Sequence, residues 1–235
     1  MSARPLRPSE YTAALIGHLH ARRDWVRGVH ALEIGFGSGV VLAALGALGA
    51  ATLRGVDIEP SAEEEASRLL DRLGYGAVAR LHRGDLWGPV AGQRFGLVAA
   101  NLPHFPMAPV AVAERLPSWS SGGADGRRLL DPFLEGLGRH LDRGGRAVIT
   151  HNGFVALARS RAVLARSGLA LRVAETLLVP IPTEKLAVMT PEVLRHEEGR
   201  SVHHYGPHAF GEVHVVEIGT PEALGCAPGR EAVPG

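Results

Sequence analysis

Three glycines spaced two residues apart form the first pattern in this chain that indicates chemistry. Gly35, Gly37 and Gly39 follow an apolar run and precede the helical pattern VVLAALGAL. Because glycine lacks a Cβ, such a turn can adopt positive φ and let a ligand approach the backbone closely. We expect its N–H groups, and those of the helix start, to face that ligand. Val40 stands where the dinucleotide fingerprint GxGxxG has its third glycine, so the pattern indicates a nucleotide-type ligand without deciding which.

Two carboxylates follow the next strands expected along the chain. Asp57 closes the apolar run ATLRGVDI, 18 residues after Gly39, which is the place of a ribose ligand in a βαβ unit. Its two oxygens can accept hydrogen bonds from both ribose hydroxyls. Nicotinamide dinucleotides and S-adenosylmethionine (SAM) both carry a ribose, so Asp57 does not separate them. Asp85 follows a glycine at another strand end, where a solvated turn is an equally good interpretation.

The stretch NLPHFP, residues 101–106, follows the strand expected at FGLVAA and favours SAM. An amide NH₂ is a poor nucleophile because its lone pair is delocalised. Two acceptors, Oδ1 of Asn101 and the C=O of Leu102, would hold both N–H groups and turn the lone pair towards a sulfonium methyl. Such positioning in a dry pocket supplies the catalysis without a strong general base. The alternative is a proline-rich strand exit with no site.

This stretch resembles the (N/D)PPY signature of methyltransferases that modify planar or exocyclic nitrogen. With GxGxG and Glu33, the chain resembles the class I SAM-dependent methyltransferases. GGADG at 122–126 and RPSE at 7–10 narrow the resemblance to the release factor glutamine methyltransferases of the HemK/PrmC family. That family carries an N-terminal helical domain for substrate recognition, and only a few residues precede RPSE here.

The resemblance implies roles for particular residues. It implies SAM (product S-adenosylhomocysteine, SAH) as cofactor and catalytic, acceptor-side roles for Asn101, Leu102 and His104. In the family pattern Asp85 lies near the adenine amino group and Leu86 packs on the ring. The implied cofactor-binding residues are Glu33, Gly35, Gly37, Gly39, Asp57, Ile58, Asp85, Leu86 and Asn101.

Two residues depart from the signature. Leu102 replaces its first proline, which keeps the carbonyl and removes the locked φ. Pro103 still favours an extended conformation at Leu102. His104 stands where the family has Tyr, Phe or Trp. We expect His104 to stack on a flat substrate or to take up a proton.

We expect an α/β fold of the Rossmann-like class I methyltransferase type. Its sheet would have seven mostly parallel strands, helices on both faces, and ligands at the carboxyl ends of the strands. Ser9 predicts the start of the first helix, and Ser61 with Glu64 predicts a capping box. The expected parts are an extended segment and helix (1–29), the methyltransferase domain (30–219) and a flexible tail (220–235).

Within that domain, residues 180–211 form a long connection before the last expected strand. Long connections are often functional, and we expect a flap that covers the substrate or mediates a homodimer. Its histidines have no cysteine partners and no clear i, i+4 pair on a helix, so we expect no metal. They are His196, His203, His204 and His208.

Composition limits the class of protein. The formal net charge of +1 argues against nucleic acid as a partner. Cys226 is the only cysteine, so we expect neither an internal disulfide nor a thiolate metal cluster. The sequence shows no signal peptide and no apolar run long enough to cross a membrane. We therefore expect a cytoplasmic protein without a membrane partner.

The expected activity is SAM-dependent methylation of an amide or other planar nitrogen. We expect a small molecule or peptide as acceptor, because residues 180–211 would enclose such a substrate. Methylation of a protein glutamine, as in the release factor enzymes, is the main alternative. A nicotinamide-dependent oxidoreductase and a non-catalytic SAM-binding module are two others.

Overall fold

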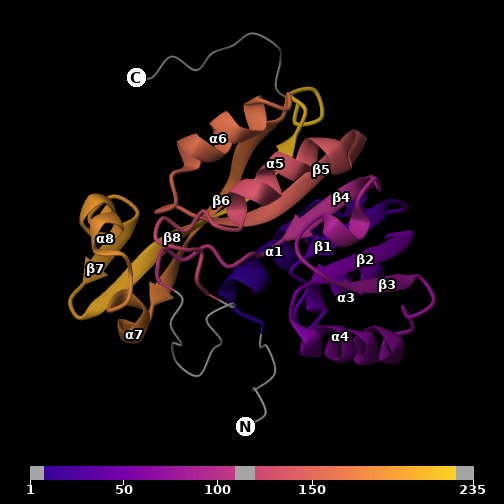
Figure 1. Cartoon of the computed structure of the whole chain (residues 1–235), viewed down its shortest axis with the longest axis horizontal. Coiled ribbons are helices and arrows are strands. Elements are labelled where there is room, and N and C mark those ends of the chain that lie inside the picture. Colours follow the sequence, from indigo (N-terminus) through magenta and orange to yellow (C-terminus); the bar gives the residue numbers. More distant parts are fainter. Residues whose placement is uncertain (1–7, 109–119, 226–235) are drawn as a thin grey trace.

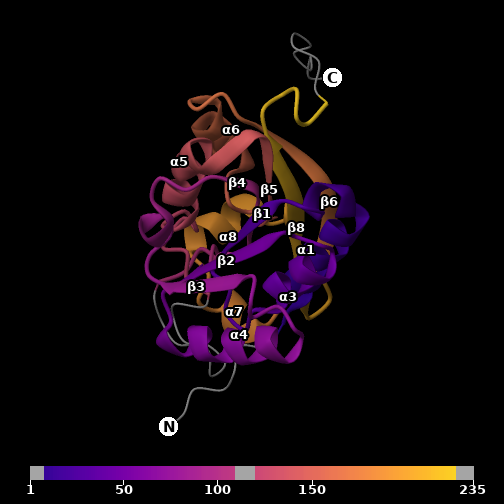
Figure 2. The same ribbon diagram turned by 90° about the vertical axis from the view of Figure 1, so that its right-hand side faces the viewer.

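One mixed sheet forms the centre of the protein in the computed structural model, which describes residues 8–108 and 120–225 (Figures 1 and 2). Its strands are β1 (His30–Ile34), β2 (Thr52–Asp57), β3 (Ala79–Arg83), β4 (Phe95–Ala100), β5 (Leu141–Asn152), β6 (Ala170–Ile181), β7 (Val202–Tyr205) and β8 (His208–Gly219). The strand order is β3-β2-β1-β4-β5-β8-β6, with β7 paired to β8. β1 to β5 run parallel, and β8 runs antiparallel to β5 and β6.

Helices cover both faces of this sheet (Figure 1). They are α1 (Glu10–Ala21), α2 (Arg23–Val26), α3 (Val40–Ala47), α4 (Pro60–Arg72), α5 (Leu130–His140), α6 (Leu157–Ala165), α7 (Thr183–Leu186) and α8 (Pro191–Glu197), with a 3₁₀ turn at Gly88–Val90. The predicted α/β fold with a mostly parallel sheet is therefore confirmed. Within the described residues the sheet has eight strands instead of seven, because β7 lies inside the expected connection 180–211 and pairs with β8.

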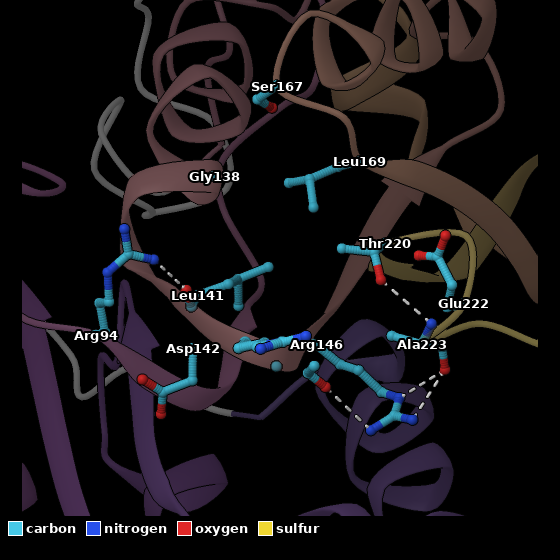
Figure 3. A pocket seen from close by; sticks show the side chains of 13 residues that line it. Arg94, Gly138, Leu141, Asp142, Arg146, Ser167, Leu169, Thr220, Glu222 and Ala223 are labelled. Atoms are coloured by element: carbon cyan, nitrogen blue, oxygen red, sulfur yellow. Dashed lines mark hydrogen bonds between the residues drawn. The ribbon is translucent and has the colours of Figure 1, made fainter.

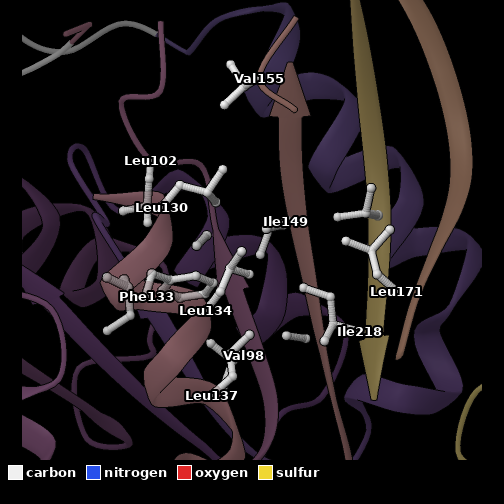
Figure 4. Packing of buried hydrophobic residues seen from close by; sticks show 14 of the residues in the cluster. Val98, Leu102, Leu130, Phe133, Leu134, Leu137, Ile149, Val155, Leu171 and Ile218 are labelled. Atoms are coloured by element: carbon white, nitrogen blue, oxygen red, sulfur yellow. The ribbon is translucent and has the colours of Figure 1, made fainter. Parts of the chain in front are cut away.

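Alternating residues of the central strands build two apolar layers. On one face Ala31, Leu97 and Ala99 pack with α1, α3 and α4. On the other face the strands pack against α5, as Figure 4 shows for Val98, Ile149, Leu130, Phe133, Leu134 and Leu137. Burying one such large side chain contributes about 1.5–3 kcal/mol. These layers hold the carboxyl ends of β1, β2, β4 and β5 in fixed register.

Of the two helix starts predicted from the sequence, one is confirmed and one is wrong. Ser9 is the N-cap of α1, as predicted. The predicted capping box of Ser61 and Glu64 is wrong, because α4 begins at Pro60 with Glu59 as its N-cap. Proline suits the first helical position, since its φ is already helical and its missing N–H would have no partner there.

Parts of the earlier expectations lie outside the described residues. They are Arg7 of RPSE and Cys226 with the end of the tail. Across residues 8–108 and 120–225, no helix has the length and apolar character needed to cross a membrane.

Candidate active site

The glycine turn joins β1 to α3. Gly35, Gly37 and Gly39 have φ of 76°, 47° and 79°, a region that favours glycine. Their N–H groups donate within the protein, to the C=O of Val56 (2.8 Å), Oδ2 of Asp57 (2.7 Å) and the C=O of Phe36 (2.8 Å) respectively. The expectation that these three N–H groups face a ligand is therefore corrected. Because its glycines have no side chains, the turn still allows a ligand to approach its backbone closely.

Gly39 also leaves no room for a side chain. A Cβ there would lie 2.6 Å from Cβ of Ala66 in α4. We expect Gly39→Ala to lower the free energy of unfolding by about 2–4 kcal/mol, from backbone strain and overpacking together. Gly168→Ala is the matched control, because φ there is +71° and a Cβ would meet nothing within 4 Å. Equal losses for the two variants in denaturant unfolding would contradict the close packing of α4 on the turn.

Glu33 belongs to β1 and is buried, with 2% of its surface exposed. Its Oε2 accepts the N–H of Leu42 at 3.0 Å. Burial, reinforced by the nearby charge of Asp57, raises the pKa of Glu33 well above its usual range. The side chain thus holds the start of α3 in place, and its contact with a cofactor remains a prediction.

Asp57 ends β2 next to the turn. Its Oδ2 accepts the N–H of Gly37 at 2.7 Å, and Oδ1 accepts the N–H of Glu59 at 2.9 Å. Burial raises its pKa, and the backbone N–H groups partly offset that effect. Each carboxylate oxygen can accept more than one hydrogen bond. Asp57 can therefore hold the turn and still accept from a ligand hydroxyl.

The neighbouring strand ends carry the other predicted cofactor residues. Ile58, directly after β2, is 58% exposed. Asp85 follows β3 and is exposed, while Leu86 is half-buried with φ of 43° and packs on the α5 layer. Because β1, β2 and β3 are parallel neighbours, the turn, Ile58 and Asp85 lie along one edge of the sheet.

Asn101 follows β4 and is fixed by two hydroxyls. Thr150 of β5 donates its hydroxyl to Oδ1 of Asn101 at 2.7 Å. Nδ2 of Asn101 donates to Oγ1 of Thr12 in α1 at 3.4 Å. The next residue, Leu102, brings the motif to the glycine turn, since a Cβ at Gly35 would lie 3.3 Å from Cδ2 of Leu102. The two motifs predicted for cofactor and acceptor therefore lie side by side.

His104 is buried, with 3% of its surface exposed. Its Nδ1 hydrogen-bonds the C=O of Leu102, and its Nε2 accepts the N–H of Asn152 at 2.8 Å. Burial lowers the pKa of His104 to about 4. The expectation that His104 stacks on a flat substrate or takes up a proton is thus corrected, because both ring nitrogens have protein partners and the side chain is buried.

Three residues around the motif were not predicted from the sequence: Thr12, Thr150 and Asn152. The sequence offered a signal for the last two, because the polar stretch THN, residues 150–152, directly follows the apolar run AVI. Thr12 gave no signal, since its contact with Asn101 joins residues 89 positions apart.

The segment between β6 and β8 lies next to the NLPHFP motif. Residues 182–207, called here the lobe, contain α7, α8 and β7. Thr190 of the lobe donates its N–H to the C=O of Pro106 at 2.8 Å, and Met189 forms a β-bridge with Met107. Among the described residues, no three His, Cys, Asp or Glu side chains are grouped so as to hold a metal ion.

A separate cavity of about 630 Å³ lies at the opposite, amino end of the strands (Figure 3). Arg94 and Arg146 line it, but their guanidinium groups donate to the C=O of Leu141 and of Ala223. None of the residues predicted for the site lines this cavity.

No family model matches the chain. It is 32% identical over 126 residues to the release factor glutamine methyltransferase of Gloeobacter violaceus, covering 50% of this chain and 44% of that protein. It is also 32% identical over 124 residues to a putative protein N5-glutamine methyltransferase of Methanocaldococcus jannaschii, covering 51% and 60%. The chain thus spans less than two thirds of the length of these relatives.

Solved structures extend the similarity to the whole fold. The E. cuniculi Mtq2–Trm112 complex, described as responsible for methylation of the termination factor eRF1, contains a chain that aligns with a TM-score of 0.58. That alignment covers 92% of this chain and 98% of the other at 17% identity. This chain therefore has the fold of the class I methyltransferases and, over about half of its length, resembles the release factor glutamine methyltransferases.

Proposed function

We propose that the protein transfers a methyl group from SAM to an amide nitrogen. The observation that carries this proposal is the contact between the glycine turn and the NLPH motif, with Oδ1 of Asn101 oriented by Thr150. The similarity to protein glutamine methyltransferases supports the same chemistry. Strand β8, antiparallel between β5 and β6, argues against the nicotinamide alternative, since the dinucleotide fold has no such strand in its usual order.

The residues at the carboxyl end of the sheet fit SAM. The backbone at Gly35 and Gly37 leaves room for close approach, and Asp57 has lone pairs left for the ribose hydroxyls. Ile58, 58% exposed, offers an apolar surface for the adenine. When bound, SAM supplies an electrophilic methyl group on a sulfonium.

The acceptor side works by positioning. Oδ1 of Asn101 accepts one N–H of the substrate amide and the C=O of Leu102 accepts the other, so the nitrogen lone pair points to the methyl carbon. The N–C bond forms as the S–C bond breaks, and the amide proton leaves to water. Leu102 is 7% exposed, and electrostatic contacts are stronger in such a water-poor site than in bulk solvent.

A glutamine side chain of a protein is the acceptor class that the relatives support, and a small-molecule amide is the second candidate. The observation favouring the second is the lobe, whose Thr190 and Met189 contact Pro106 and Met107 directly after the motif. A cover in that position suits a small acceptor, which must be held on several sides.

Methyl-labelled SAM tests the proposal and separates the acceptors. One arm uses purified release factors, with a Gln→Asn variant at any labelled glutamine as control. The other arm uses small-molecule extract fractionated by size. Transfer to an amide nitrogen in either arm supports the proposal and identifies the acceptor class, whereas label found on oxygen or carbon would contradict it.

A further inference from the structure

Within the NLPHFP motif, the environment of His104 differs most from what the resemblance to the family implies. The family has a large aromatic residue there, and this chain has a buried imidazole with a hydrogen bond at each nitrogen.

The hydrogen bonds fix its tautomer. The backbone N–H of Asn152 can only donate, so Nε2 of His104, 2.8 Å away, must accept and carry no proton. Nδ1 then carries the single ring proton and donates it to the C=O of Leu102. The neutral Nδ1–H form is the one that satisfies both partners.

Contacts to the ring, to its partner Asn152 and to the His104 backbone restrict the position of the imidazole. The Tyr11 ring of α1 meets it edge-on, with centroids 6.3 Å apart. The Tyr11 hydroxyl donates to Oδ1 of Asn152 at 2.9 Å. Gly122 and Gly126 of the GGADG stretch press on its backbone, where added Cβ atoms would lie 2.6 Å from Cα and 2.7 Å from O of His104. The imidazole therefore has little freedom to leave Leu102.

We propose that His104 is a positioning residue, which acts through the Leu102 carbonyl and does not touch the substrate. Leu102 lacks the locked φ of the proline it replaces, and the hydrogen bond from Nδ1–H fixes the direction of its C=O instead. A carbonyl oxygen has a second lone pair, which remains for the substrate amide. The kinetic consequence of this assignment rests on the proposed function, whereas the tautomer follows from the hydrogen bonds alone.

Burial and the neighbouring cations keep the ring neutral near neutral pH. Besides Tyr11 of α1, it faces His151 of β5, Arg127 before α5 and Lys185 of α7. Burial is the main cause of its low pKa, about 4, and the two cations act in the same direction.

Imidazole ¹⁵N–¹H correlation spectra of the wild-type protein test the tautomer without any activity assay. We expect the His104 signals to show Nδ1–H with an unprotonated Nε2 and to stay unchanged from pH 8 to about 5.5, well below the ordinary histidine pKa of about 6.5. An Nε2–H tautomer, or titration near 6.5, would overturn the proposal.

Kinetics of variants test the positioning. His104→Phe keeps an aromatic ring and removes the donor, and we expect kcat to fall about 10- to 100-fold, since small misplacements of reacting groups cost that much. KM for SAM should stay unchanged. His104→Gln, which restores an N–H donor, should recover part of kcat. If a folded His104→Phe keeps wild-type kcat, or His104→Gln is no better, the role is wrong. Should no methyl transfer be found, the spectra still decide the tautomer while the proposed function fails.

Discussion

Asn101→Ala is expected to reduce kcat for methyl transfer by about 10²–10³-fold, the loss typical when one preorganised hydrogen-bonding group is removed. The variant lacks the oxygen that Thr150 orients and that would accept a substrate N–H. Affinity for SAH should hardly change, because we place the Asn101 amide against the acceptor and not among the cofactor contacts that the resemblance also implies for it. Single-turnover kinetics with the identified acceptor, together with calorimetric SAH titration, separates the two effects.

Asn101→Asp is the matched control. It keeps an acceptor oxygen facing Thr150, replaces the Nδ2 donor to Thr12 by a second acceptor oxygen, and adds a carboxylate charge. It should therefore retain more activity than Asn101→Ala. Wild-type kcat in a folded Asn101→Ala variant would show that amide positioning is not the mechanism.

Asp57→Ala is expected to weaken SAH binding about 5- to 150-fold, equivalent to the 1–3 kcal/mol lost when hydrogen bonds to a buried charged group are removed. Two effects combine: the ribose contact disappears, and the N–H of Gly37 loses the oxygen that holds the turn in shape. The free energy of unfolding should fall as well, because a buried donor is left unpaired. SAH titration and denaturant unfolding measure the two losses.

Asp142→Ala controls for the removal of a carboxylate as such. Asp142 is exposed and lines the cavity at the opposite end of the sheet (Figure 3). Its removal should leave SAH affinity unchanged. Equal SAH affinity in Asp57→Ala and the wild type would exclude Asp57 from the cofactor site.

The strand-end residues were predictable because the carboxyl ends of parallel strands meet at one edge. The glycine turn, Asp57 and Asn101 each follow an apolar run in the sequence, and the register of β1 with β2 and β4 brings them together. Local patterns are sufficient for such an arrangement, since each strand sets the place of its own last residue.

Contacts between distant segments were not predictable in this way. The burial of His104 depends on Tyr11, Asn152 and the glycines at 122 and 126, which come from three other parts of the chain. β7 was missed because its pairing with β8 is made inside a segment rich in histidine and proline. The helix α4 starts at Pro60 and not after Ser61. A proline, which is favoured at the first helical position, can therefore set the start of a helix even where a capping pattern follows it.

Calorimetric titration of the wild-type protein with SAM, SAH, NAD and NADP tests most directly the claim that the glycine turn and Asp57 form a SAM site. The account predicts saturable binding of SAM and SAH that compete for one site, both weakened by Asp57→Ala, and no binding heat from NAD or NADP. Binding of NAD or NADP with no response to SAH would contradict it.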